Sequence, residues 1–161
     1  MSVLVFIGPS GAGKTRVGKR VARLLGVPFT DTDSVIVQKH GPISQIFREH
    51  GEPHFRSLER EAVQEGLAGE GVLSLGGGAV LDADTQADLL GHRVVFLTIS
   101  PDAVETRLGG DRPLVTNGVA DWIALNAPRW PIYERLADLT IDTSHRVNDE
   151  VAEEVVAWST T

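Results

Sequence analysis

The 161-residue sequence contains no cysteine, and lysine, methionine and tyrosine are all scarce. Without cysteine the chain can form no disulfide, no thiolate metal site and no cysteine nucleophile. No apolar run approaches the ~20 residues that a membrane-spanning helix needs, so we expect no contact with a membrane. The first apolar run starts at residue 3, which leaves no room for a targeting peptide and predicts a cytoplasmic protein.

Positive charge is also in short supply, because 15 basic residues face 22 acidic ones and the formal net charge is −7. Such a chain lacks the broad basic surface that holds nucleic acid, so we expect no nucleic-acid partner. Only three basic residues are lysines, and the rest are arginines, which bind planar anions in a bidentate manner. The length and the 42% hydrophobic content predict one domain over residues 1–161, and we expect a monomer.

What the chain does contain is a glycine-rich stretch at residues 8–15, Gly-Pro-Ser-Gly-Ala-Gly-Lys-Thr, which matches the pattern G-x-x-x-x-G-K-[ST]. The apolar run at residues 3–7 precedes it and is typical of a buried parallel strand. A helical pattern follows, with Val17, Val21 and Leu24 on one face. Strand, glycine-rich turn and helix together predict a P-loop that binds a nucleoside triphosphate, rather than a turn that merely joins two elements.

In such a loop, glycines let backbone N–H groups approach phosphate closely, and the helix N-terminus adds positive charge. We therefore expect Lys14 to reach the β- and γ-phosphates and the Thr15 hydroxyl to ligate Mg²⁺. The predicted nucleotide-binding residues of the loop are Gly11, Ala12, Gly13, Lys14 and Thr15.

Two acids, Asp31 and Asp33, follow a short second strand predicted at residues 27–30. Ligands of open α/β sheets bind just beyond the carboxyl ends of the strands, which is where these carboxylates lie. They can have separate roles, one facing Mg²⁺ and the other a second substrate. The alternative is that they only cap the following helix, a role that Asp33 could fill.

The remaining chain alternates strand and helix patterns. Further strands are predicted at 71–75, 93–99 and 139–142, and helices at 34–50 with a break at 41–42, from Phe55, from Ser100 to about Arg107, at 119–136 and at 147–158. Pro128 and Pro131 predict a kink or a restart within the helical stretch that contains them. The five histidines show no metal-ligand spacing and are predicted at the surface.

Five strands that alternate with helices after a P-loop predict an α/β protein of the three-layer P-loop kinase fold, with a five-stranded parallel sheet flanked by helices. Substrate-binding helices are expected as an insert at about 32–61. A glycine triplet at 76–78 exposes bare backbone at the carboxyl end of the third strand. A loop at about 109–118 is rich in glycine and proline and carries Arg112, which suggests a lid.

Taken in order, these elements resemble the shikimate kinase family over nearly the whole chain. The elements that carry the resemblance are the P-loop, Asp31 with Asp33, Gly51 with Phe55-Arg56 and Glu59, Leu75 with the glycine triplet, Arg112-Pro113-Leu114 and Arg129-x-Pro131-x-Tyr133-x-x-x-Ala137. The resemblance implies ATP-dependent phosphorylation of the 3-hydroxyl of shikimate, with Mg²⁺, on the route to chorismate and the aromatic amino acids.

The resemblance also implies how the chain would hold shikimate. Asp33 would bind the hydroxyls and assist the attacking one, and Arg56 and Arg129 would grip the carboxylate. Glu59 would orient the arginine of its own helix. The substrate would also contact the glycine triplet, Gly76, Gly77 and Gly78.

On the nucleotide side, Lys14 and Arg112 would neutralise charge on the transferred phosphoryl group, which makes them the implied catalytic residues together with Asp33. Arg107 would lie against the adenine. The implied ligands of Mg²⁺ are Thr15 and, through water, Asp31.

Two alternatives stay open at the level of sequence. Another small-metabolite kinase of this fold, such as gluconate kinase, would also pair a P-loop with acids after the second strand, although the glycine triplet and Arg129-x-Pro131-x-Tyr133 favour shikimate. A non-catalytic nucleotide-binding or regulatory module would bind ATP without turnover, and an intact set of catalytic candidates argues against it.

Overall fold

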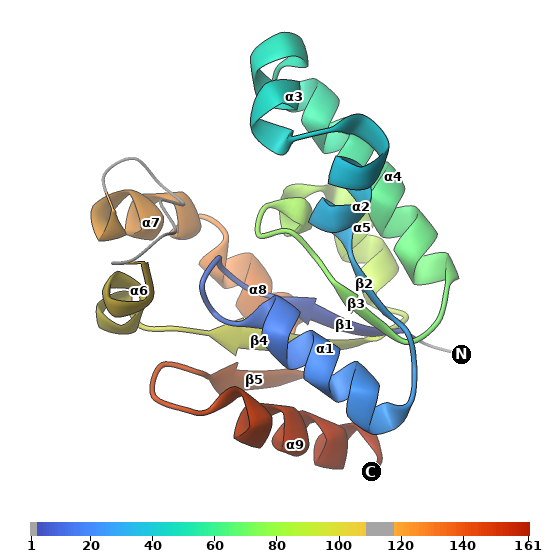
Figure 1. Ribbon diagram of the computed structural model, residues 1–161, viewed down its shortest axis with the longest axis vertical. Helices are drawn as coiled ribbons and strands as arrows, with labels where there is room; N and C mark the ends of the chain where they lie inside the picture. The colour runs from blue at the N-terminus through green and yellow to red at the C-terminus, as the bar shows by residue number, and fades with distance from the viewer. Residues whose placement is uncertain (1–2, 109–117) are drawn as a thin grey trace.

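A five-stranded parallel sheet forms the centre of the computed structural model, which describes residues 3–108 and 118–161 (Figure 1). The strands are β1 (Leu4–Ile7), β2 (Phe29–Asp31), β3 (Val72–Ser74), β4 (Arg93–Thr98) and β5 (Leu139–Asp142). They lie in the order β2-β3-β1-β4-β5, and every neighbouring pair is parallel. The predicted fold class is therefore confirmed.

Helices cover both faces of this sheet. They are α1 (Lys14–Leu25), α2 (Thr32–His40), α3 (Ile43–His50), α4 (Glu52–Ala68), the short 3₁₀ helix η1 (Ala79–Leu81), α5 (Ala83–Leu89), α6 (Pro101–Leu108), α7 (Val119–Asn126), α8 (Trp130–Leu136) and α9 (Asn148–Ser159). Figure 1 shows α1 and α9 against one face, and core contacts place α4, α5 and α8 against the other.

Alternate residues of the central strands face opposite layers. In β1, Leu4 and Phe6 belong to a core cluster with α1 and α9, whereas Val5 and Ile7 belong to a second cluster with α4, α5 and α8. Because both faces are covered, the strand is apolar at every position rather than at every second one. This burial explains why the P-loop follows an uninterrupted apolar run.

A third, smaller cluster lies where α2, α3 and α4 pack on one another through Ile36, Ile46, Phe55 and Ala62. Figure 1 shows these three helices on one side of the loop that precedes α1, with α6 and α7 on its other side. The P-loop therefore lies between two groups of helices that follow different strands.

Most predicted elements are confirmed, with shifts of a few residues at their ends. The helix predicted from Phe55 begins at Glu52, and the prolines near residue 130 separate two helices, α7 and α8, rather than kinking one. Leu24 was predicted on the buried face of α1 but is 43% exposed, because the buried stripe of this helix runs through Val17, Gly18, Val21 and Ala22. η1 and α5 occupy a segment for which the sequence patterns predict nothing.

His92 is an exception among the histidines predicted at the surface, because it is half-buried and its Nδ1 accepts a hydrogen bond from the Val3 backbone at 3.0 Å. Within residues 3–108 and 118–161, no helix is both long and apolar enough to cross a membrane. The predicted lid, with Arg112, lies outside the described residues.

Candidate active site

The loop between β1 and α1 has a backbone that only glycine adopts without strain. Gly8, Gly11 and Gly13 have φ angles of 142°, 90° and 97°. A Cβ on Gly8 would also overlap the carbonyl oxygen of Leu97 in the neighbouring strand β4. The loop therefore needs glycine both for its backbone conformation and for its close approach to the sheet.

Lys14 opens α1 and turns back over this loop. Its Nζ donates hydrogen bonds to the carbonyl oxygens of Gly8 at 2.6 Å and Pro9 at 3.1 Å. Burial lowers the pKa of Lys14 to about 8, and the nearby carboxylates of Asp33 and Asp31 oppose that shift. The ammonium group thus lies between the loop and the two acids, where a transferred phosphoryl group would need a cation.

The two carboxylate oxygens of Asp31 make different contacts. Its Oδ1 accepts a hydrogen bond from the backbone N–H of Ser34 at 3.1 Å, which caps α2, and its Oδ2 accepts one from the Thr15 hydroxyl at 2.9 Å. The cap is therefore Asp31, not Asp33, since Asp33 already lies in the first turn of α2. A hydroxyl and a carboxylate side by side offer the oxygen ligands that Mg²⁺ prefers.

Asp33 points from α2 towards the glycine triplet. Burial raises the pKa of its carboxyl, Asp31 adds to the rise, and Lys14 and Arg56 oppose it. A Cβ on Gly76 would lie 2.7 Å from Asp33 Oδ1, so glycine is required for this approach. A carboxylate with a raised pKa beside a phosphate-binding lysine is suited to accept a proton from an attacking hydroxyl.

Arg56 and Glu59 form an ion pair one turn apart on α4, as their spacing predicts. Arg56 Nη1 donates to Glu59 Oε1 at 2.8 Å, and Arg56 Nε lies 3.6 Å from Glu52 Oε1. Glu59 is only 4% exposed, and its burial raises its pKa while the hydrogen bond from Arg56 opposes that rise. A buried acid on one edge of the guanidinium fixes the direction of the other edge.

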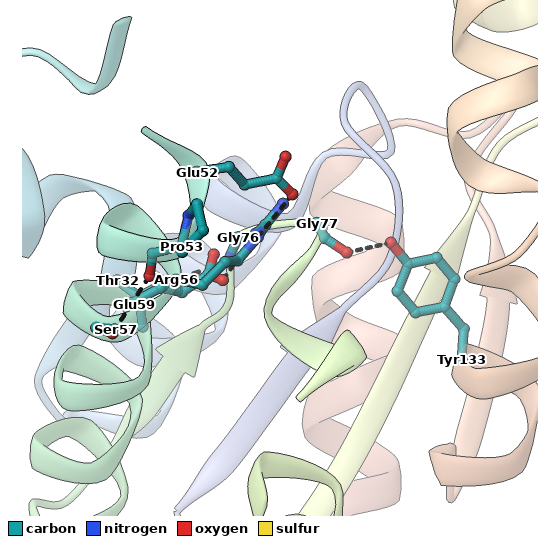
Figure 2. Close-up of polar contacts among 9 residues, drawn as sticks. All are labelled: Thr32, Glu52, Pro53, Arg56, Ser57, Glu59, Gly76, Gly77 and Tyr133. Carbon is teal, nitrogen blue, oxygen red and sulfur yellow. Dashed lines mark hydrogen bonds and ion pairs between the residues drawn. The ribbon is translucent and has the colours of Figure 1, made fainter. Parts of the chain in front are cut away.

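Side chains from three separate segments of the chain meet at the glycine triplet, because glycine leaves room for them. Added Cβ atoms would lie 3.3 Å from Arg129 Nη1 at Gly77 and 2.6 Å from Arg56 Nη1 at Gly78, next to the Asp33 contact at Gly76. Figure 2 shows the triplet approached from two sides, by Arg56 of α4 and by Tyr133 of α8. Three consecutive glycines therefore gather the predicted substrate-binding residues around one short backbone segment.

Two residues that hold the triplet in place were not predicted as site residues. Thr32, which is fully buried, accepts a hydrogen bond from the Gly76 N–H at 3.1 Å. Tyr133 donates one to the Gly77 carbonyl at 2.6 Å, and burial raises its pKa to about 12, so the phenol keeps its proton. The position of Tyr133, four residues after Arg129 in the same motif, was the available signal for its role.

Arg107 of α6 reaches the other end of the P-loop. It donates to the Gly11 carbonyl at 2.7 Å and to the Thr143 carbonyl at 2.6 Å. Arg146, Val147 and Asn148 lie at the same mouth of the cleft, although the sequence patterns did not single them out.

A cleft of about 650 Å³ joins the P-loop, the two acids and the first two glycines of the triplet. Its lining includes the P-loop residues Gly11, Gly13, Lys14 and Thr15, both acids Asp31 and Asp33, the glycines Gly76 and Gly77, and Arg107. Ala12, within the loop, is fully buried and does not line the cleft. Arg56, Glu59 and Gly78 line a separate hollow of about 290 Å³. Trp130, the neighbour of Arg129 in the sequence, packs edge-on against Phe96 with ring centroids 5.2 Å apart.

A phosphate-binding loop, a lysine, paired acids and arginines at the carboxyl edge of a parallel sheet together define a P-loop phosphotransferase. The shikimate kinase family model matches residues 10–160. A shikimate kinase of Salinispora arenicola is 49% identical over 160 residues, which cover 96% of each chain. The protein belongs to the shikimate kinase family.

Solved structures agree with this assignment. The shikimate kinase of Acinetobacter baumannii, determined in complex with shikimate, superposes with a TM-score of 0.92 at 33% identity and covers 99% of this chain and 93% of its own. A gluconokinase of Sinorhizobium meliloti reaches a TM-score of 0.61 at 19% identity, covering 97% and 90%. The second likeness extends to the fold alone, so it does not favour the gluconate alternative.

Proposed function

We propose that the protein transfers the γ-phosphoryl group of ATP to the 3-hydroxyl of shikimate, with Asp33, Arg56 and Arg129 holding the acceptor. The observation that carries the assignment of residues is their convergence on the glycine triplet. Cβ atoms added to the three successive glycines would lie 2.7 Å from Asp33, 3.3 Å from Arg129 and 2.6 Å from Arg56. A cyclic acid with several hydroxyls needs both a carboxylate for its hydroxyls and a planar cation for its own carboxylate.

The nucleotide would lie along the P-loop. Lys14 leaves the carbonyls of Gly8 and Pro9 to neutralise charge on the β- and γ-phosphates, while the N-terminus of α1 offers its unpaired N–H groups. Arg107 would lie against the adenine, and the exposed Val147 lines the same cleft. We assign the lid role to Arg112, in the segment outside the described residues.

Thr15 and Asp31 are the residues that would hold Mg²⁺. Their oxygens lie 2.9 Å apart at the start of α1, at the phosphate end of the cleft. When bound, the ion would supply positive charge that neutralises the charge developing on the transferred phosphoryl group.

Asp33 would orient the attacking hydroxyl and accept its proton as the new O–P bond forms, while the bond between the γ-phosphorus and the bridging oxygen breaks and ADP leaves. Glu59 would position Arg56, and Thr32 and Tyr133 would hold the triplet against which the substrate lies. Helices α2 to α4 would act as the substrate-binding insert, since they share a core cluster of their own. Every residue in this account lies on one chain, so a monomer suffices.

A coupled assay of ADP release tests the function directly, with shikimate, gluconate or no acceptor present. We expect turnover with shikimate and only background with the other two. Phosphorus NMR of the product should place the phosphate on the 3-hydroxyl. Turnover with gluconate would favour the other small-metabolite kinase, and ATP binding without turnover on any acceptor would favour a non-catalytic module.

A further inference from the structure

The backbone carbonyls of the P-loop are bound by side chains from several parts of the chain. Each carbonyl from residue 8 to residue 12 accepts such a bond. The pairs are Lys14 Nζ with Gly8 O (2.6 Å) and Pro9 O (3.1 Å), Trp122 Nε1 with Ser10 O (2.9 Å), Arg107 Nη1 with Gly11 O (2.7 Å) and Thr143 Oγ1 with Ala12 O (2.7 Å). The loop is therefore held from outside by α6, α7 and the segment after β5.

Trp122 differs from Lys14 and Arg107, the two charged donors, because it could not itself contact a bound nucleotide. Its side chain is only 3% exposed and belongs to the core cluster that packs against α1 and α9. An indole N–H is a donor only and carries no charge. Lys14 and Arg107 can turn towards a nucleotide, whereas the buried indole of Trp122 acts on a ligand only through the loop that it holds.

The bond to Ser10 fixes one peptide group. All described peptide bonds are trans, and in a trans peptide the C=O of Ser10 and the N–H of Gly11 point in opposite directions. Gly11 has φ of 90°, and because glycine has no Cβ its own backbone torsions restrict the rotation of this peptide little. The hydrogen bond from the Trp122 indole to the Ser10 carbonyl therefore restrains a peptide group that Gly11 alone would leave free to rotate.

We propose that Trp122 is a positioning residue of the nucleotide site, which holds the Ser10–Gly11 peptide so that the Gly11 N–H is offered to a phosphate oxygen. Gly11 and Ser10 both line the cleft, and the N–H points away from the indole. The inference rests on the proposed binding of ATP phosphates by the P-loop. It adds to that proposal a residue far along the chain, on the helix α7.

The variant Trp122→Phe tests the inference, because it removes the N–H donor and keeps an aromatic ring in the core. Loss of one hydrogen bond to the loop should raise the KM for ATP by about 3- to 10-fold, and weaken binding of inorganic triphosphate by the same factor. The KM for shikimate and the kcat at saturating ATP should stay at their wild-type values. Trp158→Phe is the matched control, since that indole stacks under Arg93 at 4.6 Å, away from the P-loop.

Unchanged affinity for ATP and triphosphate in a folded Trp122→Phe protein would overturn the inference and leave the indole with a packing role. Failure of the wild type to bind triphosphate would instead refute the proposed phosphate site. If the variant does not fold, hydrogen exchange in the wild type decides. Slow exchange of the Trp122 indole N–H, with a Gly11 amide resonance that shifts on triphosphate binding, supports the inference, and fast exchange or an unshifted amide overturns it.

Discussion

The nucleotide end of the cleft is formed by consecutive residues, 8–15, and presents mainly backbone groups, whereas the substrate end gathers side chains from α2, α4 and the start of α8 around the glycine triplet. One end depends on a local conformation that glycines permit, and the other on tertiary packing that glycines allow. Changes at the first end should therefore affect phosphoryl transfer to any acceptor. Changes at the second should affect shikimate alone.

The largest effect should come from breaking the nucleotide end at Lys14. Lys14→Met removes the cation that neutralises charge on the transferred group, so kcat should fall by about 10³-fold or more. The fold should persist, because Lys14 contacts only loop carbonyls and the cleft. Circular dichroism and turnover should be measured on the same sample. Near-normal turnover in a folded variant would remove the P-loop from the mechanism.

Asp31 and Asp33 lie two positions apart but are assigned to different ends of the cleft. Asp31 belongs to the nucleotide end and Asp33 to the substrate end. Asp33→Asn should lower kcat by roughly 10²- to 10⁴-fold, because it removes the group that accepts the proton. Burial raises the pKa of Asp33, so the wild-type kcat/KM for shikimate should decline as pH falls through a value above the usual aspartate range. Asp31→Asn should instead shift the Mg²⁺ titration. Identical Mg²⁺ shifts in both variants would contradict this division.

Gly78→Ala should damage only the substrate end. The new Cβ would lie 2.6 Å from Arg56 Nη1, and the flexible arginine rather than the backbone would move. Loss of its charge-assisted contacts should raise the KM for shikimate by roughly 10- to 100-fold and leave the KM for ATP unchanged. Gly91→Ala is the control, because its Cβ would meet only the Asp88 carbonyl, at 3.8 Å. Equal effects on both KM values would mean that the two ends are not separate.

The pH dependence gives the mildest test of the nucleotide end. Burial lowers the pKa of Lys14 to about 8, and only the protonated form can neutralise phosphate charge. The kcat/KM for ATP should therefore fall above about pH 8, by roughly tenfold per unit, as the free enzyme loses this proton. A profile that stays flat to about pH 10, where an unperturbed lysine titrates, would contradict the buried, low-pKa lysine.

The same comparison explains what could be predicted from the sequence. The P-loop and its strand and helix are predictable, because local conformation and an uninterrupted apolar run determine them. The roles of Arg56 and Arg129 came from resemblance, since 73 residues of chain separate them and no local pattern brings them together. The two contacts of Asp31 could not be predicted together from the sequence. Asp31 caps α2 with one carboxylate oxygen and contacts Thr15 with the other, so it need not choose between these two contacts.

Contacts made across the fold were not predictable from spacing. The bond from Trp122 to Ser10 joins residues 112 apart, and a tryptophan in a helical pattern ordinarily indicates only core packing. The contact of Thr32 with Gly76 was equally hard to predict. Thr32 lies between two acids, and its hydroxyl accepts a hydrogen bond from the Gly76 N–H instead of facing solvent. In both cases the partner is a backbone group of a glycine-rich segment, which leaves no side-chain pattern to read.

The central claim is that Arg56 and Arg129 bind one carboxylate of the acceptor, and a double-mutant cycle with a modified substrate tests it most directly. Binding of shikimate and of an analogue with a neutral amide in place of the carboxylate should be measured for the wild type, Arg56→Ala and Arg129→Ala. Each arginine substitution should weaken shikimate binding by roughly 10- to 100-fold and barely affect ATP. Arg→Lys should also weaken it, because lysine lacks the planar fork.

The amide analogue should bind the wild type poorly and lose little further affinity in either variant, because the partner of the arginines is already gone. That non-additivity is the predicted result. If the penalty of the amide simply added to that of each arginine substitution, or if the amide bound the wild type as tightly as shikimate does, the two arginines would not share the carboxylate.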